Sequence, residues 1–132
     1  IDAAEQSWSV DDIVANELRL LVDGPTRGQA AERAAIRKSV AEMSYINYAQ
    51  QRDSPKFTML DPPAARRLPE ITCPIRVLVG DADTFGMRSM AAEIERACPG
   101  AALVRIPDAA HMLALECPEV VERELRSFLR EM

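Results

Sequence analysis

The stretch Ile75-Arg76-Val77-Leu78-Val79-Gly80-Asp81-Ala82-Asp83 decides the fold of this chain. Its first five residues are mostly β-branched or aliphatic and alternate little between apolar and polar positions. Such a run, bounded by Pro74 and Gly80, is typical of a strand buried on both faces of a parallel sheet. Two carboxylates, Asp81 and Asp83, follow the strand. We therefore expect a strand over 75–79 that ends in an acidic loop.

A helix and a second strand follow this loop. Apolar residues recur at helical spacing from Met87 to Ala97, Pro99-Gly100 ends that pattern, and a second short apolar run over 103–106 stops at Pro107. A strand, a crossover helix and a parallel strand make a β-α-β unit. Two strands cannot form a stable sheet alone, so another segment must pair with them.

The last segment predicts a closing helix from Pro118 to about Arg130. Proline suits the first helical position because its missing N–H would have no partner there. The apolar residues of this helix are expected to face inward: Val121, Leu125, Phe128 and Leu129. Met87 and Met90 are expected to lie in the core on the preceding helix.

Residues 1 to about 67 are predicted to be helical. Ser9 and Asp12 form a weak capping-box pattern before a helix over 10–22, which Gly24-Pro25 stops. A second helix is expected from near Gln29 to about 50–53. It carries one stripe that needs a partner surface: Ile36, Val40, Met43 and Asn47.

A short helix over 60–67 is expected next, with Asp61 as its cap and Pro62 in its first turn. Three aromatic side chains in the helical segment could line a pocket, although packing between helices is the commoner role: Trp8, Tyr45 and Tyr48.

Composition excludes several classes of protein. The chain has 132 residues, and 16 Lys and Arg against 21 Asp and Glu give a formal net charge of −5. Its 48% hydrophobic content is that of a packed domain, so we do not expect disorder. The basic residues are dispersed, which argues against a nucleic-acid partner. No apolar stretch is long enough to span a membrane and no export signal is visible, so we expect no membrane partner.

Cysteine and histidine usage points to a reducing compartment and to no metal. Cys73, Cys98 and Cys117 are odd in number and widely spaced, which predicts neither a disulfide framework nor a thiolate zinc site. We expect a cytoplasmic protein. With His111 as the single histidine, a His-rich catalytic zinc site is close to excluded, and we expect no cofactor.

Asp83 and His111 are the candidate catalytic residues. Each follows a predicted parallel strand, and functional groups collect at the carboxyl ends of such strands. The 28 positions between them accommodate one helix and one strand, so the two loops should be neighbours. A carboxylate can accept the Nδ1–H of an imidazole and fix its tautomer for acid and base work. We expect the carboxylate to approach the ring to about 2.6–3.2 Å.

These segments resemble the α/β-hydrolase family. The stretch from Leu68 to Asp83 resembles the point where a chain re-enters the core from its cap, runs the penultimate strand and presents the acid in Gly-x-x-Asp. The stretch from Ile106 to Glu119 looks like the histidine loop and the start of the last helix. The helices before residue 67 look more loosely like the later part of a cap in bacterial small-molecule hydrolases such as enol-lactonases.

The resemblance implies an α/β fold, the C-terminal portion of an α/β-hydrolase parallel sheet preceded by a helical cap segment. Residues 1–67 would be the cap, and residues 68–132 the strand-helix-strand-helix part of the core. The family carries its serine in G-x-S-x-G, and no serine of this chain has such flanking glycines. Because the chain also begins at Ile1, we expect the C-terminal half of a hydrolase, which either accompanies its missing half or self-associates through a sheet edge.

The implied function is hydrolysis of a small-molecule ester or lactone, with Asp83 and His111 serving a serine outside this chain. The chain alone is expected to be inactive. Alternatives are an Asp nucleophile, as in dehalogenases and epoxide hydrolases, a lyase or perhydrolase reaction, or a non-catalytic hydrolase-like binding module.

Three neighbouring residues have less specific interpretations. Asp81 competes with Asp83 for the role of acid, but the Gly-x-x-Asp register favours Asp83 and leaves Asp81 facing solvent. Glu116 is expected to serve a helix N-terminus as a dipole and capping residue. Cys117 has no basic partner and is expected to be an inert thiol.

Overall fold

The structure is a computed structural model that describes residues 9–50 and 58–131. Its elements, in chain order, are α1 (Val10–Glu17), the π-helix η1 (Leu18–Asp23), the 3-10 helix η2 (Ala31–Arg33), α2 (Ala34–Gln50), the 3-10 helix η3 (Ala64–Glu70), β1 (Ile75–Gly80), α3 (Phe85–Ala97), β2 (Ala101–Ile106), α4 (Leu113–Glu116) and α5 (Pro118–Glu131).

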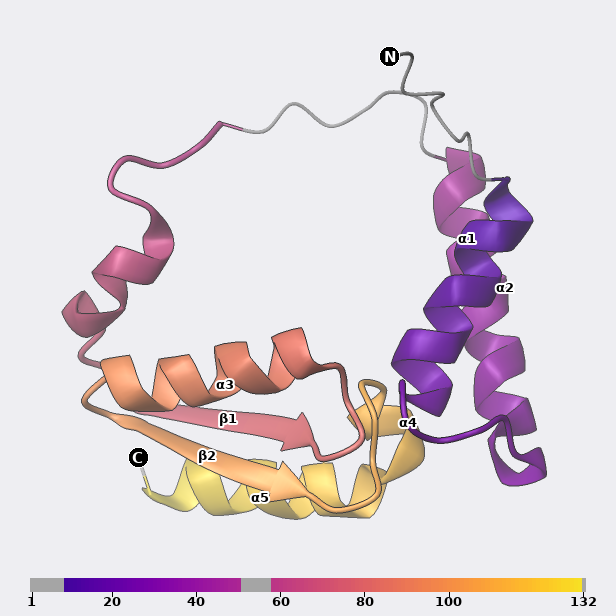
Figure 1. The fold of residues 1–132 in the computed structure, drawn as a ribbon. Helices are drawn as coiled ribbons and strands as arrows, with labels where there is room; N and C mark the ends of the chain where they lie inside the picture. Colours follow the sequence, from indigo (N-terminus) through magenta and orange to yellow (C-terminus); the bar gives the residue numbers. More distant parts are fainter. Residues whose placement is uncertain (1–8, 51–57, 132) are drawn as a thin grey trace.

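The β-α-β unit forms as the sequence predicts. Strands β1 and β2 pair in parallel, in a register that runs from Ile75 opposite Ala101 to Gly80 opposite Ile106. Helix α3 lies on one side of the two strands and α5 on the other (Figure 1). Helix α3 begins after Thr84, whose side chain accepts a hydrogen bond from the Met87 amide. The sheet of the described residues has two strands, β1 and β2.

Several side chains expected in the core are exposed. Leu125 and Leu129 of α5 and Met90 of α3 each leave more than half of their surface in solvent. In β1, Val79 is buried but Val77 and Leu78 are only half-buried, so the strand is not covered on both faces. The physical reason is that two strands offer too little sheet surface to cover the apolar sides of α3 and α5.

The N-terminal helices pack as an antiparallel pair with their own core (Figure 1). Ser9 and Asp12 form the complete capping box at the start of α1. One side chain of α2 joins three of the α1–η1 helix in a buried cluster: Val14, Leu18, Val22 and Val40. The four residues lie on facing sides of the two helices, which therefore form a small unit beside the sheet.

The expected stripe of α2 is only partly correct. Ile36 and Val40 pack as predicted, but Met43 is 54% exposed and Asn47 is also exposed. The contact row instead runs on to Tyr48, because residues four apart share the face that meets α1.

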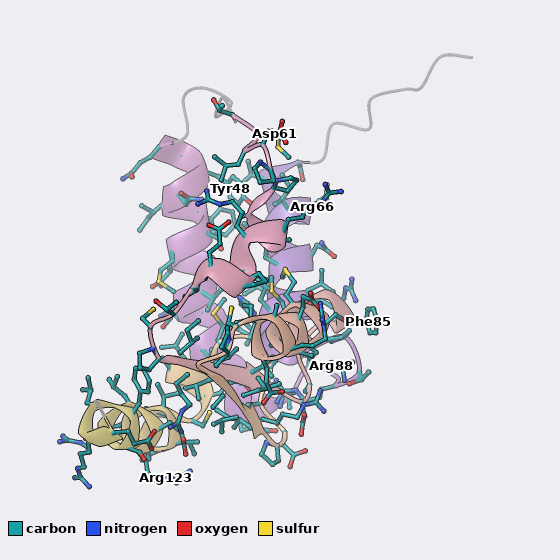
Figure 2. All side chains as sticks on the ribbon, turned by 90° about the vertical axis from the view of Figure 1, so that its left-hand side faces the viewer. Tyr48, Asp61, Arg66, Phe85, Arg88 and Arg123 are labelled. Atoms are coloured by element: carbon teal, nitrogen blue, oxygen red, sulfur yellow. The ribbon has the colours of Figure 1, made fainter. Side chains whose placement is uncertain are left out.

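The two tyrosines of α2 join α2 to the first helix. The Tyr48 hydroxyl donates to Glu17 at 2.6 Å and the Tyr45 hydroxyl to Asp11 at 2.8 Å. These hydrogen bonds to carboxylates raise the pKa of both phenols. Figure 2 shows Tyr48 on the side of α2 that meets α1. Trp8 lies outside the described residues.

The expected helix over 60–67 is wrong at its start. Helix η3 begins at Ala64 after Pro63, and Asp61 does not cap it. Pro62 precedes another proline, and a residue before proline is disfavoured in the helical region, so Pro62 cannot open the helix. Because η3 runs to Glu70, the cap boundary expected at 67/68 falls within it and stays a prediction.

No helix of the described part of the chain is long and apolar enough to cross a membrane.

Candidate active site

Asp83 lies in the turn after β1 and is buried. Its side chain is 4% exposed, its backbone amide donates to the Gly80 carbonyl at 3.1 Å, and its Oδ1 accepts the Thr84 amide at 2.6 Å. The cap of α3 is Thr84, so Asp83 does not cap the helix with its side chain. One carboxylate oxygen, Oδ2, is left to face the neighbouring loop.

His111 lies in the loop between β2 and α4 and meets that oxygen. Its Nδ1 is 2.9 Å from Asp83 Oδ2, inside the range expected from the sequence. Its side chain is 36% exposed, in contrast to the buried carboxylate. Within the described residues, the only hydrogen bond of the ring is the one at Nδ1, so Nε2 is free to exchange a proton with another group.

Two backbone hydrogen bonds hold the loops of the Asp83–His111 dyad together. The Asp81 amide donates to the Ile106 carbonyl and the Ala82 amide to the Ala109 carbonyl, both at 2.9 Å. Gly80 allows this close approach, because a Cβ there would lie 2.1 Å from the Ala109 carbonyl oxygen. These contacts join the two loops as far as Ala109, two residues before the histidine.

Asp81 takes no part in the dyad. It is exposed, as the sequence analysis expects, and its carboxylate lies 3.9 Å from the Arg105 guanidinium. Cys117 also agrees with its inert interpretation. Burial raises the pKa of its thiol, and the nearby Glu116 and Glu119 carboxylates raise it further, so little thiolate is present near neutral pH.

The capping role expected for Glu116 is wrong. Instead of serving the N-terminus of α5, Glu116 ends α4 and turns back toward the histidine loop, where Oε1 accepts the Ala110 amide at 2.9 Å. Its Oε2 lies 2.9 Å from Arg27. Both of its oxygens are therefore used away from the helix that follows. Sequence reasoning missed Arg27 altogether, although Gly24-Pro25 before it ends a helix, and the last carbonyls of a helix lack helical donors.

The described residues contain no group of three or more His, Cys, Asp and Glu side chains that could hold a metal ion.

The sequence also matches a known protein family. A model of the Alpha/beta hydrolase family matches residues 3–124. The chain belongs to the α/β-hydrolase family. No curated protein sequence matches it.

Solved structures of three enzymes share the fold at low identity. An N-acyl homoserine lactone degrading enzyme matches with a TM-score of 0.66 and 22% identity, over 96% of this chain and 49% of its own. A thermophilic esterase matches with a TM-score of 0.61 and 20% identity, over 92% and 46%. Proline iminopeptidase from Mycobacterium smegmatis matches with a TM-score of 0.55 and 20% identity, over 92% and 42%. The chain thus spans about half the length of these three proteins.

Proposed function

We propose that this chain is part of a serine-type α/β hydrolase that cleaves a small-molecule ester or lactone, with Asp83 and His111 as the acid and base of its triad. The observation that carries the proposal is the 2.9 Å contact between Nδ1 and the buried carboxylate, which leaves Nε2 for proton transfer. The lactone-degrading enzyme and the esterase of the same fold support the substrate class.

In the proposed mechanism, Asp83 holds His111 with its proton on Nδ1. Nε2 then takes the hydroxyl proton of a serine outside this chain as the serine oxygen attacks the substrate carbonyl. The imidazolium so formed, stabilised by the carboxylate, gives the proton to the departing alkoxide and leaves an acyl-enzyme. A water, deprotonated by Nε2 in the same way, then attacks the acyl-enzyme, and the imidazolium returns its proton to the serine oxygen as the acyl–oxygen bond breaks and the carboxylic acid leaves.

The chain also depends, in this proposal, on the rest of the enzyme. This chain alone has no turnover, because it supplies acid and base but no nucleophile. Within the described residues one edge of β1 is unpaired, and we propose that it accepts a strand from the rest of the enzyme. The half-buried Val77 and Leu78 support this, because they lie in an apolar groove that α3 continues with Met87 and Ile94. We place the enzyme in the cytoplasm because its three cysteines are free.

The test is steady-state kinetics of the complete enzyme with p-nitrophenyl acetate and γ-butyrolactone as probes. His111→Ala should lower kcat by several orders of magnitude while circular dichroism shows a folded protein. Asp81→Asn, a change in the exposed carboxylate two residues from Asp83, is the matched control and should keep parental kcat. A folded His111→Ala variant with parental kcat would remove the histidine from the mechanism.

A second measurement distinguishes a serine nucleophile from an Asp nucleophile and from a non-catalytic binding module. A fluorophosphonate should label one serine of the complete enzyme, which peptide mass spectrometry locates. Turnover of a haloalkane or an epoxide without such labelling would favour an Asp nucleophile. A folded protein without turnover of any of these substrates would favour the binding module.

A further inference from the structure

Three backbone carbonyls at the C-terminal end of η1 accept hydrogen bonds from outside the helix: those of Leu21, Val22 and Asp23. The Leu21 carbonyl would accept from residue 26 in a π-helix, but η1 ends at Asp23, so that donor lies outside the helix. The carbonyls of Val22 and Asp23 are the last two of the helix, which ends as Gly24 turns with a φ of 79°. Such orphan carbonyls need other donors.

Arg27 supplies donors to two of these carbonyls and to the histidine loop. Its Nε donates to the Asp23 carbonyl at 2.6 Å, and its Nη2 to the Val22 carbonyl at 2.8 Å. The same guanidinium donates to the Asp108 carbonyl through Nη1 and to the Glu116 carboxylate through Nη2 at 2.9 Å. One planar group thus joins the end of η1 to both sides of the loop that carries the histidine.

Glu116 passes this connection to the residue before His111. Its side chain is 8% exposed, and Oε1 accepts the Ala110 amide while Oε2 accepts from Arg27. Both oxygens are therefore occupied, as a buried carboxylate requires. The third orphan carbonyl, that of Leu21, accepts the His111 amide at 3.1 Å.

Two successive amides of the histidine loop are consequently held from outside the loop. Ala110 is fixed by Glu116, and His111 by η1. The side chain of Met112, the next residue, packs against the buried cluster of the two N-terminal helices. The loop after β1 meets the same segment, because a Cβ on Gly24 would lie 2.4 Å from the Ala82 carbonyl oxygen. The end of η1 therefore touches the loops of both dyad residues.

We propose that Arg27 and Glu116 are positioning residues for His111, which tie the imidazole to the end of η1 so that Nδ1 stays on Asp83. The consequence for catalysis rests on the proposed function, whereas the effect on the ring does not. Loss of this clamp (Arg27 and Glu116) lets the histidine loop shift, because the Ala110 amide and the Asp108 carbonyl lose their partners. Displacement of a catalytic group by about 1 Å can cost about 100-fold in rate.

The principal variant is Glu116→Gln in the complete enzyme. Its amide carbonyl can still accept from Ala110, but the charge that faces Arg27 is lost. We expect kcat for p-nitrophenyl acetate to fall about 10- to 100-fold, with KM changed less than about two-fold. The matched control is Glu70→Gln, which removes the exposed ion pair with Arg67 at 2.9 Å and should leave both constants unchanged.

A second readout follows the ring itself by 15N-resolved NMR. In the parent the Nδ1 proton of His111 should exchange slowly with water, and in Glu116→Gln it should exchange at least about ten-fold faster. Arg27→Gln should act in the same way, and the double variant should be no worse than either single variant, because the two residues form one unit. A structural role alone would lower the melting temperature without changing kcat or the Nδ1 proton below it.

Hydrogen exchange of the unsubstituted enzyme tests the clamp even if the variants do not fold. The amides of Ala110 and His111 should be protected as strongly as those of β1. Unprotected amides, or folded Glu116→Gln and Arg27→Gln variants with parental kcat and Nδ1 exchange, would overturn the proposal. A parent that hydrolyses no ester or lactone would overturn the proposed function, and the NMR and exchange readouts would then decide the clamp alone.

Discussion

Replacement of Asp83 by asparagine should trap His111 in the wrong tautomer. The Thr84 amide, 2.6 Å from Oδ1, can only donate, so the side-chain carbonyl of the introduced asparagine must turn toward it. The amide NH2 then takes the place of Oδ2, 2.9 Å from Nδ1. An NH2 group cannot accept the Nδ1–H, so the ring moves its proton to Nε2 and offers Nδ1 as the acceptor.

The expected loss follows from this geometry. With a proton on Nε2, the ring cannot take the hydroxyl proton of a nucleophile, and such an error of tautomer costs up to about 10⁴ in kcat. That factor corresponds to about 5.4 kcal/mol of activation free energy. The fold should survive, because asparagine has the shape of aspartate and keeps the hydrogen bond from Thr84.

Two measurements check the reasoning. Steady-state kinetics of the complete enzyme should give the loss in kcat, with Asp81→Asn as the control that keeps it. Long-range 1H–15N spectra should show the proton of the neutral ring on Nδ1 in the parent and on Nε2 in Asp83→Asn. A folded variant that keeps either the parental tautomer or the parental kcat would refute the argument from the Thr84 amide.

Two further predictions concern the fold around the dyad. Gly80→Ala should destabilise the protein by about 3 kcal/mol or more in thermal or urea unfolding, because its Cβ would collide with the Ala109 backbone. Gly86→Ala, whose Cβ meets nothing within 4 Å, is its control, and equal stability of the two variants would contradict the steric argument. In alkylation by iodoacetamide near neutral pH, the exposed Cys73 should react well before Cys117, whose raised pKa leaves it protonated until the pH rises further. Peptide mass spectrometry reads the order, and faster labelling of Cys117 would show the pKa argument to be wrong.

The dyad could be predicted from the sequence because a general rule fixes it. Parallel strands place their carboxyl-end loops at one edge, so a strand pattern before Asp83 and another before His111 suffice to bring the pair together. Their catalytic role stays a prediction. Periodicity also gave the helices, but it indicates only that a helix has an apolar side and not what covers it. For that reason periodicity could not show that Leu125 and Met90 are exposed.

The surroundings of the dyad follow no such rule. Arg27 and Glu116 are 89 positions apart in sequence, and no local pattern relates them. Glu116 stands before Pro118 at the start of a helix, where a capping role is the natural expectation. Only the folded protein shows that Glu116 is instead buried and paired with Arg27. Gly24-Pro25 was the available signal, because it ends the helix and leaves the last carbonyls, that of Leu21 among them, without helical donors.

The separation between Arg27 and Glu116 also sets an order of assembly. Asp83 and His111 are joined by a segment of 28 residues, and closing the 89-residue segment costs about 1 kcal/mol more in chain entropy. The β-α-β unit can therefore bring acid and base together early, from local contacts. Glu116 follows the histidine in the chain, so during synthesis it emerges after the dyad. We therefore expect the attachment of the histidine loop to η1 to follow the pairing of acid and base during folding, and to hold that pair in place once it has formed.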